Sequence, residues 1–176
     1  MRILLWDIDG TLVNTGGAGV RAIGDAVKVS EASSLALSRM RLDGMTDRHI
    51  ARLLCAAHRH LGDPSIDIET HTAQVTDLEI HHVLRAYLDR LTASLRSSDN
   101  YRVLPGVVAV LDALEGQVVH ALGTGNLEEG ARLKLEHGGL WHRFAFGGYG
   151  SDAEDRAELL RIAWTKADRK STRLNS

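Results

Sequence analysis

The fold is decided near the N-terminus by the stretch Ile3-Leu4-Leu5-Trp6-Asp7-Ile8-Asp9-Gly10-Thr11-Leu12. Its first residues are apolar without alternation, which is typical of a strand buried on both faces of a parallel sheet. Gly10 ends this strand, and a helical spacing of apolar residues begins only at Ala18. We therefore predict a buried strand over residues 3–8 with two carboxylates at its carboxyl end.

The block that follows, up to residue 100, has the pattern of helices only. Apolar residues recur at spacings of three and four in three stretches, and no convincing strand interrupts them. The residues on these predicted apolar faces are Val20, Ile23 and Val27, then Ile50, Leu53, Leu54, Ala57 and Leu61, then Ile80, Leu84, Tyr87, Leu88, Leu91 and Leu95. The sequence therefore predicts an all-helical insertion over residues 14–100.

Alternation of strands and helices resumes after residue 100. Pro105 is a favoured first residue of a helix and Gly116 is a favoured stop. The apolar face predicted between them consists of Val107, Val110, Leu111 and Leu114. A short apolar strand over residues 118–122 and a helix over residues 128–137 come next. This alternation predicts a doubly wound parallel α/β sheet, whose ligands bind at the carboxyl ends of the strands.

The last part of the chain is predicted to add a third strand and a final helix. Residues 144–146 are candidates for the strand. Ser151 and Glu154 have the spacing of a capping box, which predicts a helix over residues 152–170. The residues expected to face inward from it are Ala157, Leu160, Ala163, Trp164 and Ala167. Residues 171–176 contain no apolar strand and are expected to be a foreign tail.

Composition and charge exclude several classes of protein. The chain has 176 residues, with 21 Lys and Arg against 23 Asp and Glu and a formal net charge of −2, so no basic excess is available for nucleic acid. The single cysteine, Cys55, cannot form an intramolecular disulfide, which fits a reducing compartment. The N-terminal apolar run is too short for a signal peptide or a membrane span. We expect a soluble, cytoplasmic protein with no membrane or nucleic-acid partner.

Two carboxylates end the first predicted strand. Asp7 and Asp9 are two residues apart, so their side chains point to the same side of an extended backbone. Like charges this close are costly unless a cation or an electrophile compensates them. Mg²⁺ is a hard cation that prefers oxygen ligands and keeps several waters, and it suits such a pair. The alternative is a pair of turn-forming residues before Gly10; the strand context favours the functional interpretation.

These residues carry a family resemblance. The run that resembles the first motif of the haloacid dehalogenase superfamily, whose members are mostly phosphatases, is Asp7-x-Asp9-Gly10-Thr11-Leu12. Thr124, after the second predicted strand, matches the second motif, and Lys134 in the next helix matches the third. The family's fourth motif, an acidic pair after a further strand, has no counterpart before residue 176. The sequence therefore looks truncated.

The helical block extends the resemblance. It lies where phosphoglycolate-phosphatase-like members insert a helical cap, and the run that resembles the substrate-facing loop of that cap is Gly44-Met45-Thr46-Asp47. The resemblance implies a Rossmann-like core over residues 1–13 and 101–170 with an inserted all-helical cap over residues 14–100. Many relatives have an acidic residue where Asn14 stands and a basic one where Met45 stands, which argues against an acidic substrate such as phosphoglycolate.

The resemblance also implies a role for each matched residue. Asp7 would attack phosphorus to form an aspartyl-phosphate, and Asp9 would act as general acid and then as general base. Thr124 would hold phosphate oxygens, and Lys134 would offset charge on Asp7 and on the phosphoryl group. The implied substrate-binding residues are Gly10, Thr46, Thr124, Gly125 and Asn126. The implied ligands of Mg²⁺ are Asp7 and Asp9.

The predicted function is thus a Mg²⁺-dependent phosphatase that hydrolyses a small phosphorylated metabolite. Two alternatives stay open. A sugar-phosphate mutase of the same superfamily shares every motif, and only product analysis separates the two. A catalytically inactive fragment or binding module is compatible with the missing fourth motif. Asp152, Glu154 and Asp155 are candidates to replace the missing acids, but acidic residues in a first helical turn are expected for the helix dipole alone.

Overall fold

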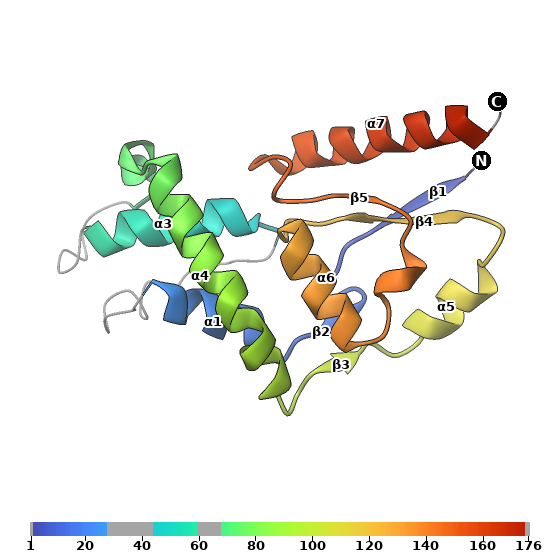
Figure 1. Ribbon diagram of the computed structural model, residues 1–176, viewed down its shortest axis with the longest axis horizontal. Helices are drawn as coiled ribbons and strands as arrows, with labels where there is room; N and C mark the ends of the chain where they lie inside the picture. The colour runs from blue at the N-terminus through green and yellow to red at the C-terminus, as the bar shows by residue number, and fades with distance from the viewer. Residues whose placement is uncertain (1, 28–43, 60–67, 175–176) are drawn as a thin grey trace.

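A parallel sheet places the acidic motif at one of its edges. The computed structural model describes residues 2–27, 44–59 and 68–174, and its main sheet has the strand order β1–β4–β5 (Figure 1). The strands are β1 (Ile3–Trp6), β4 (Val119–Gly123) and β5 (Gly147–Gly148). Both pairings are parallel, so the carboxyl ends of all three strands meet on the same side. The predicted parallel α/β sheet is confirmed.

The first strand is shorter and less buried than predicted. β1 ends at Trp6 because the carbonyl of Ile8 already accepts turn hydrogen bonds, among them one from the amide of Leu12 at 2.9 Å. Leu4 and Leu5 are 38% and 39% exposed, so the prediction of burial on both faces was wrong. Within the described sheet β1 pairs only with β4, and α7 (Arg156–Leu174) packs on β4 and β5.

The third strand was predicted too early in the chain. Pairing with β4 occurs at Gly147 and Gly148, whereas residues 144–146 were expected to form the strand. The amide of Leu122 still bonds to the carbonyl of Phe146 at 3.0 Å, so the prediction missed by only a few residues. Two glycines carry no side-chain pattern, and close packing against α7 explains why they are glycines: a Cβ on Gly148 would lie 2.2 Å from the carbonyl oxygen of Leu159.

Helices cover both faces of the sheet (Figure 1). α5 (Val107–Ala113) and α6 (Glu128–His137) lie on one side, and α7 lies on the other. The buried residues that α5 and α6 share with β4 and the turn after β1 are Ile8, Val107, Leu111, Leu122, Ala131 and Leu135. α6 has the predicted bounds. Val110 of α5 is 44% exposed, because Val107 and Leu111 alone face the core.

The last helix begins later than predicted and turns another face to the sheet. The carboxylate of Asp155 accepts from the amide of Glu158 at 2.8 Å, so Asp155 caps α7 in place of Ser151. The residues of α7 that are buried are Leu159, Ala163 and Ala167, whereas Leu160 and Trp164 are exposed. α7 also continues to Leu174, so the first residues of the predicted tail are helical.

The block between β2 (Val13–Asn14) and β3 (Arg102–Val103) is helical where the structure describes it. Its elements are α1 (Ala18–Ala26), α3 (Asp47–Arg59), the 3-10 helix η1 (Ile68–Gln74) and α4 (Asp77–Arg96). α1 and α3 pack against α4 and form a hydrophobic core separate from that of the sheet. The predicted helices are confirmed; Leu61 lies outside the described residues. Of the described helices, none is long and apolar enough to cross a membrane.

A two-stranded ribbon joins the helical block to the sheet region. β2 and β3 pair antiparallel, with Val13 opposite Val103 and Asn14 opposite Arg102. The ribbon stands where the sequence predicts the borders of the helical insertion, near residues 13 and 101. Sequence patterns did not predict it, because two residues per strand are too few to show alternation.

Candidate active site

A cavity of about 350 Å³ opens between the helical block and the carboxyl ends of β1 and β4. The predicted site residues that line it are Asp7, Asp9, Thr124, Gly125, Asn126 and Lys134. Their gathering follows from the parallel sheet, because the loops after β1 and β4 leave its same edge. Further residues that line the cavity, from α1, α3, α4 and α7, were not among the predicted set.

Asp7 is paired with a basic residue that the sequence analysis did not single out. Its Oδ2 accepts from Nη2 of Arg156, the first residue of α7, at 2.7 Å, and its Oδ1 accepts from the amide of Ile8 at 2.8 Å. Arg156 also reaches the carbonyl of Gly44 in the helical block at 3.3 Å. A sequence signal existed, since a cation in the first turn of a helix opposes the helix dipole and needs another reason to be there.

Lys134 contacts Asp9, whereas the resemblance implied that it offsets the charge of Asp7. The Lys134 Nζ, almost fully buried on α6, lies 2.8 and 3.0 Å from the two carboxylate oxygens of Asp9 and 2.6 Å from Oδ1 of Asn126. The side-chain Nδ2 of Asn126 donates to Oδ2 of Asp9 at 2.8 Å. Burial opposes the ionisation of Asp9, yet the Lys134 charge and these hydrogen bonds hold its pKa below the ordinary value. Asp9 is therefore a carboxylate in this state.

Thr124 and Gly125 form the turn after β4. Oγ1 of the fully buried Thr124 accepts from Nδ2 of Asn126 at 2.9 Å, which leaves its hydroxyl hydrogen free to donate into the cavity. Position 125 requires glycine, because a Cβ there would lie 2.3 Å from the carbonyl oxygen of Met45. The carbonyl of Gly125 accepts from the amide of Asp47 at 2.8 Å. The turn after β4 thus touches both the cavity and the helical block.

Gly10 and Thr46 are the predicted site residues that do not line the cavity. Gly10 has φ 76° and donates from its amide to the carbonyl of Val13 at 3.0 Å, so it shapes the turn after Asp9. The Thr46 hydroxyl donates to the carbonyl of Glu154 at 2.9 Å and accepts from the amide of His49 at 3.2 Å. Neither residue lines the cavity.

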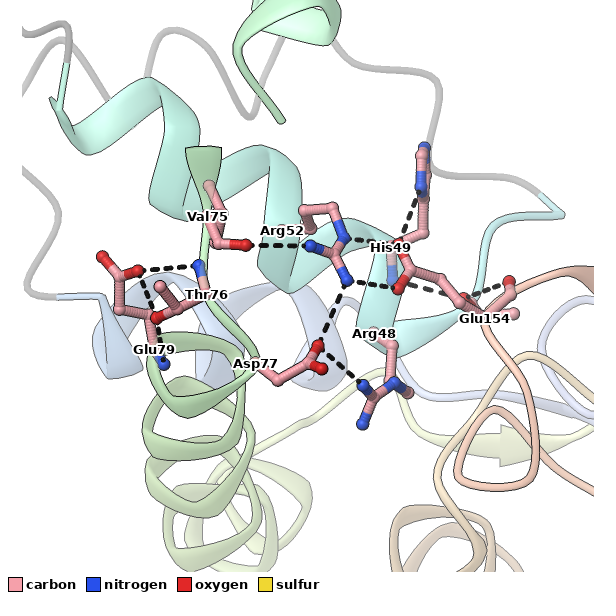
Figure 2. Close-up of polar contacts among 9 residues, drawn as sticks. Arg48, His49, Arg52, Val75, Thr76, Asp77, Glu79 and Glu154 are labelled. Carbon is pink, nitrogen blue, oxygen red and sulfur yellow. Dashed lines mark hydrogen bonds and ion pairs between the residues drawn. The ribbon is translucent and has the colours of Figure 1, made fainter. Parts of the chain in front are cut away.

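An ionic network fastens the helical block to the loop before α7 (Figure 2). Arg52 of α3 donates two hydrogen bonds to the carboxylate of Glu154, from Nε at 2.8 Å and from Nη2 at 2.9 Å. Its Nη1 donates to the carbonyl of Val75 at 3.1 Å. Hydrogen bonds from Arg52 lower the pKa of Glu154 against the effect of its partial burial. Because Glu154 is two residues from Arg156, the network also positions the partner of Asp7.

Asp47 adds a buried carboxylate to the cavity wall. It lies at the start of α3, and its Oδ2 accepts from the amide of Leu127 at 2.9 Å. Burial raises its pKa to about 6, although the charge of Lys134 and the bond from Leu127 act in the opposite direction. Asp47 belongs to the loop that resembles the cap's substrate-facing segment, but it was not among the predicted site residues.

The raised pKa of Asp47 predicts a pH dependence of stability. The folded protein holds this proton more tightly than the unfolded chain, whose pKa is near 3.8, so the stabilisation present at lower pH is lost as the pH rises through about 6. At roughly 1.4 kcal/mol per pKa unit, the free energy of unfolding should fall by about 3 kcal/mol from this group. Urea unfolding of both proteins isolates this group: the stability of the wild type relative to Asp47→Asn should be roughly 2–3 kcal/mol lower at pH 7 than at pH 4. Parallel profiles of the two proteins would contradict it.

The carboxylates present suit Mg²⁺. In the part of the chain that the structure describes, no three acidic, histidine or cysteine side chains cluster as a metal site. Mg²⁺ is nevertheless commonly bound through one or two carboxylates, with waters and substrate phosphate oxygens as its other ligands. Asp7 and Asp9 supply two such groups at the end of β1. Both oxygens of Asp7 and Oδ1 of Asp9 each accept one hydrogen bond and keep a lone pair, whereas Oδ2 of Asp9 accepts two.

Comparison with known proteins identifies the family. Residues 1–167 match the sequence profile of haloacid dehalogenase-like hydrolases, and the chain belongs to that family. The fold resembles that of CbbY from Rhodobacter sphaeroides, solved in complex with phosphate, with a TM-score of 0.61 and 19% identity over 96% of this chain and 73% of that one.

A second solved structure is similar to about the same degree. It is a protein from Lactobacillus plantarum that was assigned as a phosphoglycolate phosphatase, with a TM-score of 0.56 and 18% identity over 95% of this chain and 71% of that one. A search of the curated proteins found no match. At these identities the structural likeness establishes the fold alone.

Proposed function

We propose that this hydrolase is a Mg²⁺-dependent phosphatase that hydrolyses a small phosphomonoester through an aspartyl-phosphate on Asp7. The observation that carries the proposal is the state of Asp7: its carboxylate lines the cavity, is one-third exposed, and is held by Arg156 at 2.7 Å. A nucleophilic carboxylate needs this combination of access and fixed orientation. CbbY, which shares the fold, was crystallised with phosphate, the product that such a reaction releases.

The chain's own residues divide the first step among them. An oxygen of Asp7 forms a bond to phosphorus while the bond from phosphorus to the alcohol oxygen breaks, and the alcohol takes its proton from Asp9. The Thr124 hydroxyl and the Gly125 amide, whose residues both line the cavity, would donate to phosphoryl oxygens. Mg²⁺ held by Asp7 and Asp9 would supply positive charge to the phosphoryl oxygens.

The two steps of the reaction require different protonation states of Asp9, and the contact between Lys134 and Asp9 influences which state is present. Asp9 is ionised while Lys134 pairs with it, and this is the form that accepts a proton from water in the second step. An incoming phosphoryl group competes with Asp9 for the ammonium of Lys134, and weaker pairing raises the pKa of Asp9 towards the acid form needed in the first step. We propose that the helical block closes over the cavity as a cap and excludes water from it.

Release of inorganic phosphate tests the proposal. The purified protein is incubated with a panel of small phosphomonoesters, with Mg²⁺ and with a chelator, and the products are analysed for both free phosphate and rearranged ester. We expect free phosphate in stoichiometric amounts, dependent on Mg²⁺. Conversion to an isomeric phosphate ester without free phosphate would support the mutase instead. No reaction with any ester, in protein shown to be folded, would contradict the proposal.

A further inference from the structure

Two buried polar groups of the helical block face the cavity without a hydrogen-bond partner among the described residues. Tyr87 of α4 is 1% exposed, and no such bond is made by its hydroxyl. Asp47 of α3 is 9% exposed; its Oδ2 accepts from Leu127, whereas its Oδ1 has no partner in the described chain. Both groups line the cavity, so a ligand bound there can make hydrogen bonds with them in place of solvent.

The hydroxyl of Tyr87 lies close to both Lys134 and Asp47. A Cβ added to Gly19 would lie 3.9 Å from the Tyr87 hydroxyl and 3.4 Å from Nζ of Lys134. A Cβ added to Gly130 would lie 3.6 Å from the same hydroxyl and 3.7 Å from Oδ2 of Asp47. The unpartnered groups therefore stand beside the basic residue of the phosphoryl site, within reach of the same small molecule.

Among the described residues, the rest of this wall carries no positive charge. The side chains that the helical block adds to it there are the apolar Val20, Ile23, Met45 and Ile50 and the polar but uncharged Thr15. The two basic side chains that line the described cavity, Lys134 and Arg156, are already paired with Asp9 and Asp7. A carboxylate on the leaving group would therefore face Asp47 with no described cation beyond Lys134 and Arg156, which are already paired, and this is unfavourable in a buried site.

We propose that Tyr87 and Asp47 bind hydroxyl groups of the leaving alcohol, so that the site selects phosphate esters of small neutral polyols over those of hydroxy acids. Asp47 can only accept, and it takes a hydrogen bond from a substrate hydroxyl at Oδ1; the Tyr87 hydroxyl can donate or accept. The cavity, at about 350 Å³, has room for a ligand of this size. This inference rests on the proposed phosphatase function and assigns its substrate class.

Three esters and two substitutions test the assignment. Glycerol 3-phosphate has free hydroxyls, phosphoglycolate has a carboxylate, and phenyl phosphate has neither. For glycerol 3-phosphate we expect kcat/KM to fall about three- to tenfold in Tyr87→Phe and ~10-fold or more in Asp47→Asn. In each variant the value for phenyl phosphate should fall by less than that for glycerol 3-phosphate, and Asp47→Asn should raise the value for phosphoglycolate. Tyr149→Phe removes a hydroxyl from another buried tyrosine, outside the cavity, and should change nothing.

Failure of the inference can be told apart from failure of the proposed function. If the wild type preferred phosphoglycolate, or if kcat/KM fell equally for all three esters in both variants, the substrate assignment would be wrong. The proposed phosphatase function would be unaffected. If no ester is hydrolysed, the proposed phosphatase function is wrong, and calorimetric binding of glycerol 3-phosphate and phosphoglycolate then tests the substrate assignment. The assignment is correct only if glycerol 3-phosphate binds more tightly than phosphoglycolate and Tyr87→Phe weakens the binding of glycerol 3-phosphate. Asp47→Asn keeps an acceptor for the amide of Leu127, so the fold should survive.

Discussion

Replacing Asp7 with Asn should lower the rate of phosphate release by about 10⁴-fold or more, since an amide is a poor nucleophile and the covalent step has no substitute. The substitution keeps the size of the side chain and an oxygen that can still accept from Arg156. Initial rates with a generic phosphomonoester under saturating Mg²⁺ measure the effect.

The matched control for this prediction is Asp25→Asn, on the exposed side of α1 away from the cavity. It removes the same charge and should leave the rate unchanged. Activity of Asp7→Asn within tenfold of the wild type, with Asp25→Asn equally active, would remove Asp7 from the role of nucleophile.

The second large effect is expected at Arg156. Its guanidinium is the group that holds Asp7 in a fixed orientation, which the proposed attack on phosphorus requires, so Arg156→Gln should reduce kcat by roughly 10²–10³-fold. Arg156→Lys keeps the charge but loses the planar geometry, and it should recover only part of that loss. Rates are measured together with circular dichroism, because α7 begins at this residue.

Arg161→Gln provides the control for Arg156. Arg161 lies further along α7, is exposed, and pairs only with Glu158 of the same helix at 2.9 Å in the described structure. An exposed pair of this kind contributes little, so full activity is expected. If Arg156→Gln retained activity within threefold of the wild type, the pairing with Asp7 seen in the structure would not serve the reaction.

Strong local patterns explain which elements could be predicted. α6 has its predicted bounds because a polar turn precedes its first acidic turn and glycines follow its end. The strand before it was displaced by one residue only, from 118–122 to Val119–Gly123. β5 was misplaced because its residues are glycines, and the start of α7 was misplaced because Ser151 is engaged by the amide of Glu128 at 3.2 Å.

The residues of the candidate site also divide into those that the sequence could predict and those that it could not. Asp7, Asp9 and Thr124 could be predicted because each follows a strand that the sequence reveals. Arg156 and Tyr87 could not, because their roles depend on which helix faces the cavity, and the spacing of Tyr87 is that of an ordinary core residue. The ion pairs of the site could not be predicted either, because no sequence pattern indicates that Lys134 contacts Asp9.

The central claim is that Asp7 becomes phosphorylated during turnover, and the most direct measurement is the mass of its peptide after an acid quench. Asp9→Asn should be used, because loss of the general base slows breakdown of the acyl phosphate and lets it accumulate. After reaction with acetyl phosphate and Mg²⁺, we expect a phosphoryl group on the peptide that contains Asp7, and none in the double variant that also carries Asp7→Asn. Phosphate release by the wild type with no adduct at Asp7, or with the adduct on another residue, would contradict the account.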